Sequence, residues 1–242
     1  MKKVFLASVL FLTVLAVSAQ KQVINDPNAE TRALSGSFNG IKVSHAIDLY
    51  LTQGETEGVA VSASKEEYRN KIKTFIENGV LRIMYDNDDK FWKTGANKKL
   101  KAYVSFKTLN LLHASGASDV KVNGTLKAND LDMDFSGASD FDGSVTANSI
   151  KADVSGASHI KITSGKVTNL KVDASGASDF IGYDLVADNC TAEASGASGI
   201  QITVNNELNV HASGASDVRY KGEGRIRDLK TSGASSVARK SK

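Results

Sequence analysis

Acidic side chains recur at one position of a repeated pattern, and they are the residues best spaced for cation chemistry. Successive members are 19 or 20 residues apart; they are Asp134, Asp153, Asp173 and Glu193. In a fold that repeats with this period, the four carboxylates would form an outward column with about 4.8 Å between neighbours. Because Ca²⁺ prefers clustered carboxylate oxygens, the column is a candidate site for Ca²⁺ or a cationic partner. Lys151 and Lys171, each two residues from an acid, favour the alternative of a charge ladder that lysine neutralises.

A second candidate site is an aromatic cluster inside the charged stretch at residues 86–99. Phe91, Trp92 and Lys93 combine large apolar surface with a cation, and exposed anchors of this kind are typical of partner-binding loops. The alternative is that both rings cover an open side of the fold, since large aromatic side chains are usually mostly buried. These three residues are therefore the partner-binding candidates, with a capping role as the competing interpretation.

The spacing of the serines and histidines does not indicate nucleophilic or metal-dependent catalysis. The serines recur in Ser-Gly-Ala-Ser units, without the Gly-x-Ser-x-Gly spacing of a nucleophile elbow. The four histidines lie far apart; they are His45, His113, His159 and His211. We therefore predict exposed histidines, no zinc site and no cofactor. Cys190 is the only cysteine, which excludes an intrachain disulfide, and its place in the repeat predicts a buried side chain.

The Ser-Gly-Ala-Ser tetrapeptide occurs seven times at intervals of 18 to 21 residues, a period that indicates a solenoid. The copies begin at residues 115, 136, 155, 175, 195, 213 and 232. Apolar and polar residues alternate on both sides of each copy, as in half-buried strands. We predict an all-β, single-stranded β-solenoid (β-helix) with rungs of about 20 residues. Each tetrapeptide forms a corner with an inward alanine, and a Gly or Asn corner and a third short strand complete the rung.

The N-terminal segment indicates the cellular compartment of the protein, and its charge balance limits the kinds of partner that it can bind. Residues 1–19 contain a lysine pair, an apolar run and a small-residue cleavage site, which predicts a secretory signal peptide. Removing Lys2 and Lys3 reduces the 30 basic residues to 28, against 27 acidic residues, so the charge gives no basis for nucleic-acid binding. The mature chain has no apolar run of bilayer-spanning length. We divide it into an N-terminal extension (20–35), a divergent solenoid part (36–110) and the regular repeat (111–242).

Several segments resemble the GIN domain. They are FNGIKV at 38–43, IDLYLTQG at 47–54, GVLRI at 79–83 and the serial Ser-Gly-Ala-Ser-Asp units. The resemblance covers residues 36–237 and implies a secreted β-solenoid of a family common in Bacteroidetes and described as an auto-transporter adhesin head domain. It implies no catalytic residue. This chain departs from the repeated unit at His159, Gly199 and Ser236, which replace the aspartate after the tetrapeptide.

The function predicted from these features is a non-catalytic, adhesin-like binding or surface-interaction module. The expected partners are a glycan, a cell-envelope component or a second copy of the chain, and the expected location is the periplasm, the cell surface or the extracellular medium. The alternative is a polysaccharide-active β-helix enzyme, a lyase or glycosidase, because right-handed β-helices often host such sites. An enzyme of this kind requires acids that converge in a deep groove, whereas a binding module should present flat faces of stacked side chains.

Overall fold

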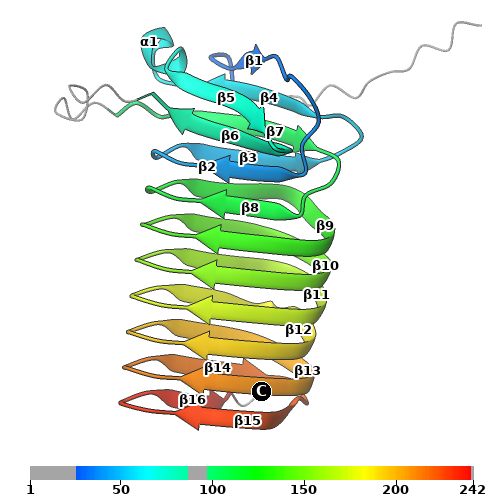
Figure 1. The fold of residues 1–242 in the computed structure, drawn as a ribbon, viewed down its shortest axis with the longest axis vertical. Coiled ribbons are helices and arrows are strands. Elements are labelled where there is room, and N and C mark those ends of the chain that lie inside the picture. Colours follow the sequence, from blue (N-terminus) through cyan, green and yellow to red (C-terminus); the bar gives the residue numbers. More distant parts are fainter. Residues whose placement is uncertain (1–25, 87–96, 241–242) are drawn as a thin grey trace, which may run out of the picture.

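The computed structural model describes residues 26–86 and 97–240, and its main feature is a stack of parallel strands (Figure 1). The predicted signal peptide and the aromatic cluster of Phe91, Trp92 and Lys93 lie outside the described residues. One short helix, α1 (Glu66–Arg69), occurs in the described part. The strands are β1 (Glu30–Arg32), β2 (Gly40–Val43), β3 (Asp48–Gln53), β4 (Gly58–Ser62), β5 (Ile72–Glu77), β6 (Val80–Tyr85), β7 (Lys101–Phe106), β8 (Leu111–Ala114), β9 (Asp119–Phe135), β10 (Asp140–Val154), β11 (His159–Ala174), β12 (Asp179–Ala194), β13 (Gly199–Ala212), β14 (Asp217–Lys221), β15 (Arg225–Thr231) and β16 (Ser236–Arg239).

The regular part of the solenoid consists of five long strands, β9 to β13, that pair in parallel. Each strand bends around one side of the molecule and so contributes to two faces (Figure 1). Apolar residues stack from rung to rung, as Phe141 does between Val120 and Ile160. The predicted β-solenoid is confirmed. Within β9 to β13 the Gly or Asn corner does not divide the rung into separate strands; at Gly143 and Ser144, for example, the pairing shifts at a bulge and the strand continues. In the last rung the corner at Gly222 does separate two strands, β14 and β15.

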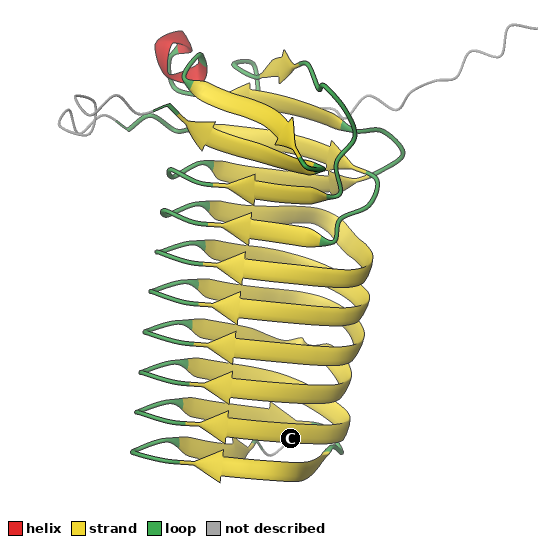
Figure 2. Ribbon diagram, viewed as in Figure 1, coloured by secondary structure: helices red, strands yellow, loops and turns green. Residues whose placement is uncertain are grey.

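The Ser-Gly-Ala-Ser turns form one column along an edge of the molecule, as predicted (Figure 2). Backbone hydrogen bonds join successive turns, such as the bond that Ala157 N donates to Gly137 O at 2.8 Å. Gly156 has a φ of +74°, and an added Cβ there would lie 2.5 Å from Gly137 O, so that only glycine fits. The prediction of an inward alanine is wrong, because Ala157 is exposed and the following Ser158 is buried.

The buried serine continues the inward alternation of the strand that follows each turn. Six of these serines are buried: Ser118, Ser139, Ser158, Ser178, Ser198 and Ser216. The hydroxyl of Ser178 donates to Val154 O at 3.0 Å and to Ser175 O at 2.9 Å, and the Oγ of Ser158 accepts a bond from Ser139 N at 3.1 Å. A serine suits this position because its small side chain fills the corner and satisfies buried backbone groups.

The N-terminal rungs are stacked in an order that differs from their order in the sequence. β2 and β3 pair with β6 and β7 on one side and with β8 and β9 on the other. The chain therefore leaves the β2–β3 rung, forms the β6–β7 rung, and crosses back to begin β8. Between β2 and β3, Ala46 N donates to Gly116 O at 2.9 Å, so the turn at residues 44–47 stacks on the first Ser-Gly-Ala-Ser turn and belongs to an early rung.

The two ends of the stack are covered differently. Antiparallel strands β1, β4 and β5, together with α1, lie over the N-terminal end (Figure 1). In the described residues β15 and β16 carry no such cover, and Leu229, at an inward position of this last rung, is 49 % exposed. Between the two ends the interior is filled by stacked apolar side chains, of which Phe106, Phe135 and Phe180 are among the largest that are fully buried.

Candidate functional site

The candidate site is one face of the solenoid, which we call the front sheet. It consists of β5, β6, β2 and β8, the C-terminal halves of β9 to β13, and β15 (Figure 1). The strand register aligns its outward side chains in a row that we call the outer column. From the N-terminal end it contains Phe75, Arg82, Lys42, His113, Asp134, Asp153, Asp173, Glu193, His211 and Lys230. The face is thus cationic at both ends and acidic in the middle.

The acidic middle contains the four carboxylates that the sequence spacing brings together, and each pairs directly with the next across adjacent strands. Lys151 forms an ion pair with Asp153, and the ammonium of Lys171 lies 3.5 Å from a carboxylate oxygen of Glu193. Partial burial, and then the charges of Glu193 and Asp153, raise the pKa of Asp173. Among the described residues, no group of three or more His, Cys, Asp or Glu side chains is arranged to hold a metal ion. The two lysines lie beside the acids as the charge-ladder interpretation requires, and capture of Ca²⁺ or a cationic partner stays a prediction.

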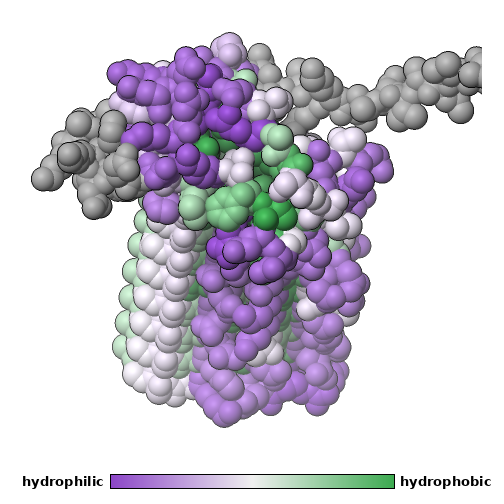
Figure 3. All heavy atoms as spheres, turned by 45° about the horizontal axis from the view of Figure 1, so that its top comes forward, coloured by the Kyte–Doolittle hydropathy of each residue, from purple (hydrophilic) through white to green (hydrophobic). Residues whose placement is uncertain are grey.

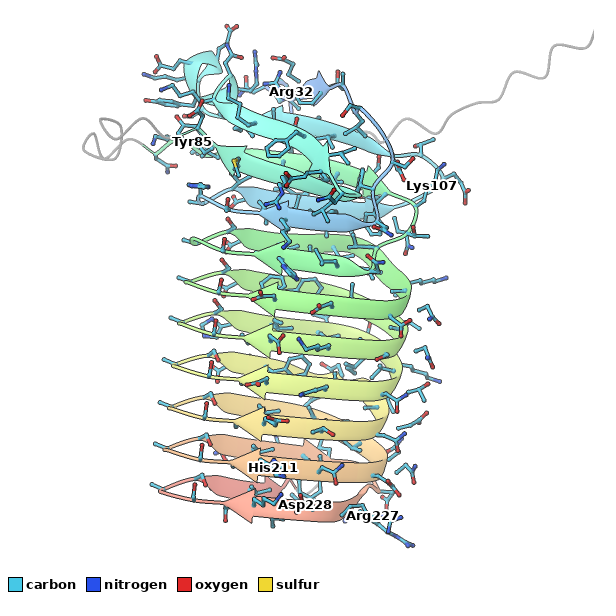
Figure 4. All side chains as sticks on the ribbon, in the orientation of Figure 1. Arg32, Tyr85, Lys107, His211, Arg227 and Asp228 are labelled. Carbon is cyan, nitrogen blue, oxygen red and sulfur yellow. The ribbon has the colours of Figure 1, made fainter. Side chains whose placement is uncertain are left out.

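The C-terminal end of the outer column is a small network of opposite charges. His211 Nε2 lies 2.9 Å from Asp228 Oδ2, and Lys230 Nζ lies 3.0 Å from the same oxygen (Figure 4). These two hydrogen bonds lower the pKa of Asp228. Beside the network, a groove of about 400 Å³ runs between the outer column and the small serines of the turns, with Glu193 and Ser195 among its lining residues.

The N-terminal end of the outer column combines cations with an aromatic ring. Arg82 and Lys42 are direct partners on β6 and β2, and His113 follows on β8. Together with Ser44 they line a groove of about 260 Å³. Phe75 pairs with Arg82 across β5 and β6 and is 42 % exposed. Figure 3 shows an apolar area near this end of the molecule, surrounded by hydrophilic residues.

Sequence reasoning missed this cationic end because its residues come from strands that are stacked out of sequence order. Arg82 is next to Lys42 in space, although the two are 40 positions apart in the chain. One signal was available: Lys42 precedes Ser44 by two residues, the same offset at which His113 precedes Ser115. Because the turn at Ser44 contains no glycine, the offset is harder to recognise than in the regular repeat.

The opposite face, which we call the back sheet, consists of β1, β4, β7, β3, the N-terminal halves of β9 to β13, β14 and β16. It carries the aspartates that follow the turns. Asp48, Asp119 and Asp140 stack on successive rungs, and burial followed by the neighbouring carboxylate raises the pKa of Asp48 and of Asp119. His159 replaces the next aspartate, with its Nδ1 3.0 Å from Asp140 and its Nε2 3.5 Å from Asp179. Because His159 replaces an aspartate, Asp140 and Asp179 each lie beside an imidazole that can hydrogen-bond to them, and not beside a third carboxylate that would repel them.

The remaining single-residue predictions have mixed outcomes. Cys190 is buried, as predicted, and this burial raises the pKa of its thiol, which fits an inert side chain. The histidines are less exposed than predicted, because all four are half-buried. His113 is the clearest case: its side chain is 23 % exposed, and burial lowers its pKa.

The fold and the front sheet define a β-solenoid whose outer faces are ladders of stacked side chains. The family model described as "Putative auto-transporter adhesin, head GIN domain" matches residues 37–224. The chain therefore belongs to the GIN domain family, as its resemblance in sequence implies. No curated protein matches the chain. No helix in the described part is both long and apolar enough to cross a membrane.

Solved structures share the fold at low sequence identity. A putative adhesin from Bacteroides fragilis NCTC 9343 is 21 % identical, with a TM-score of 0.79, and the alignment covers 88 % of this chain and 98 % of that chain. A putative adhesin from Parabacteroides merdae ATCC 43184 is 18 % identical, with a TM-score of 0.65 and coverage of 89 % and 98 %. A putative lipid binding protein from Parabacteroides distasonis ATCC 8503 is 17 % identical, with the same TM-score and coverage.

Proposed function

We propose that this protein is an exported, non-catalytic module that binds a component of a cell surface, such as a glycan or another envelope constituent, through its front sheet. Membership of an adhesin-like family supports surface interaction, and so do the names of the solved structures, which include adhesins and one lipid binding protein. The straight columns of outward side chains support binding more than catalysis, because the acids lie side by side on one open face, whereas a glycosidase places its two carboxylates on either side of the bond that it cleaves.

The observation that carries this proposal is the composition of the front sheet. Two grooves, of about 260 and 400 Å³, lie along one continuous face, one at each end of the acidic ladder. The groups beside them are cations, carboxylates, hydroxyls and imidazoles, which can hydrogen-bond to a polar, extended partner on several successive rungs. Because these side chains project from paired strands, they hold a fixed spacing without a loop that must close.

The test is co-sedimentation of the mature chain, residues 20–242, with cell-envelope preparations and with insoluble polysaccharides. We expect saturable retention on at least one preparation, and no release of soluble sugar from any of them. Release of sugar that depends on the protein would support the alternative polysaccharide-active enzyme. Export is tested separately by fractionating cells that express the full chain, where the proposal requires a shortened protein outside the cytoplasm.

A further inference from the structure

The N-terminal groove of the front sheet contains two neighbouring cations, and only one of them, Arg82, forms an ion pair with a described carboxylate. Arg82 and Lys42 are paired on adjacent strands, about 4.8 Å apart, where like charges are destabilising. The Nε of Arg82 lies 2.7 Å from Glu77, but among the described residues no carboxylate forms an ion pair with Lys42. Glu77 does not line the groove, whereas both cations do. Among the charged side chains that line the groove, the two cations outnumber the one carboxylate, Asp134, so the wall carries a surplus positive charge that an anion would relieve.

His113 adds a buried polar atom that has no partner. Its Nε2 is buried and lacks a hydrogen bond in the described part of the chain, while its Nδ1 lies 4.0 Å from Asp134 Oδ2. The imidazole lines the same groove as Lys42 and Arg82. A buried polar atom without a partner is costly, so a turn of the imidazole that brings this covered nitrogen to a ligand hydroxyl in the groove would be stabilising. Ser115 and Asp134, which also line the groove, offer further groups for hydroxyls.

Phe75 supplies an apolar surface at the end of the same row. Ile72, Thr74 and Ile76 are the inward residues of β5, so that Phe75 points outward. In the described part of the chain β5 pairs with β6 alone, so Phe75 lies on the edge strand of the front sheet with its ring open to solvent. An exposed ring beside cations and hydroxyl-binding groups matches the two surfaces of a sugar, whose C–H face is apolar and whose edge is polar.

We propose that this groove binds a carboxylate-bearing sugar of an acidic polysaccharide, a hexuronate. Arg82 and Lys42 hold the carboxylate, for which the planar guanidinium is suited. His113 and Ser115 meet hydroxyls of the same sugar, and Phe75 packs against a neighbouring sugar of the chain. The inference rests on the proposed function and names the class of glycan that the front sheet recognises.

The probe is a trigalacturonate, and its fully methyl-esterified form is the matched ligand without charge. Binding to the mature chain is measured by calorimetry at low ionic strength, about 50 mM, because surface charge is screened by salt. We expect the ester to bind at least about tenfold more weakly than the acid, since the buried part of the charge contact is lost. Equal binding of acid and ester would overturn the proposal.

Variants locate the contact. Lys42→Gln and Arg82→Gln should each weaken binding of the acid by about tenfold, and Phe75→Ala should weaken the acid and the ester alike. Lys166→Gln removes the same charge from an exposed position on a different face and should bind as the parent does. If Arg82→Gln unfolds, Lys42→Gln alone decides, because the Lys42 side chain is in no described ion pair. Binding that survives Lys42→Gln overturns the assignment to this groove.

A further measurement distinguishes failure of the hexuronate inference from failure of the proposed function. The same preparations are tested against the envelope fractions used for the proposed function. If the envelope is bound but trigalacturonate is not, the hexuronate inference falls and the binding module stands. If neither is bound by folded protein, both fall.

Discussion

At the scale of single residues, the turns depend on a glycine for their backbone path and on a serine for their interior. The tetrapeptide itself was readable from the sequence, but the direction of its side chains was not. The inward and outward alternation of side chains along a strand cannot be continued through a turn, because a residue in the left-handed region changes which side the next side chain faces. Ala157 is consequently exposed and Ser158 buried, the opposite of what the size of alanine suggests.

Ser178→Ala should lower the free energy of unfolding by about 1–3 kcal/mol, because Val154 O and Ser175 O lose the buried hydroxyl proton that they share. Ala177→Leu, at the exposed neighbour, is the matched control and should change it by less than about 0.5 kcal/mol. Urea unfolding followed by circular dichroism measures both. A larger loss in Ala177→Leu than in Ser178→Ala would return the alanine to the interior.

At the scale of elements, the columns of the front sheet follow from register. Parallel pairing without a shift places each residue on its equivalent in the next rung, so a period in the sequence becomes a row in space. For this reason Asp134, Asp153, Asp173 and Glu193 could be grouped from spacing alone. The grouping of Arg82 with Lys42 could not, since it depends on the crossover between the β6–β7 rung and β8.

Asp173→Asn tests the electrostatics of the ladder through pH. The pKa of Asp173 is raised in the folded protein, so folding favours the protonated acid, and stability is lost as pH rises through the folded pKa. The variant should therefore be more stable than the parent at pH 7, with a difference that vanishes below about pH 3. Thermal unfolding across this range measures the difference. A variant less stable than the parent at pH 7 would contradict the assignment.

Asp228→Asn is the control of opposite sign. The pKa of Asp228 is lowered by His211 and Lys230, so its contribution is present at neutral pH and lost as pH falls through the folded pKa. This variant should be less stable than the parent at pH 7 and should approach it in acid. The two single variants together separate repulsion within the ladder from attraction at its C-terminal end.

Calcium distinguishes the two interpretations of the acidic column. Capture of Ca²⁺ predicts that about 1 mM calcium raises the melting temperature of the parent and that Asp153→Asn/Asp173→Asn abolishes the rise. A ladder compensated by Lys151 and Lys171 predicts no change with calcium or chelator, and a double variant at least as stable as the parent. We favour the second outcome, because the lysines already pair with Asp153 and Glu193.

At the scale of the whole molecule, a regular sequence repeat builds an elongated stack with flat faces. The structure of the N-terminal end of this stack could not be predicted from the sequence. The seven turns fix the stacking of residues 115–235, whereas the N-terminal rungs are ordered by long-range pairing that no local pattern records. The cationic and aromatic end of the front sheet arises in that region. The sequence predicted a column of stacked acidic side chains on the front sheet. In the structure the same column also has a cationic and aromatic segment at its N-terminal end.

The most direct measurement compares the front sheet with the back sheet in binding to envelope preparations. Lys42→Glu/Lys230→Glu reverses two charges on the front sheet, and Lys121→Glu/Lys161→Glu reverses two on the back sheet. The variants are matched, because each breaks one described ion pair: Lys230 with Asp228 on the front and Lys161 with Asp142 on the back. With both variants folded, the front variant should lose about tenfold or more in affinity and the back variant should bind as the parent does. Equal losses, or a loss confined to the back variant, would contradict the front sheet as the binding face.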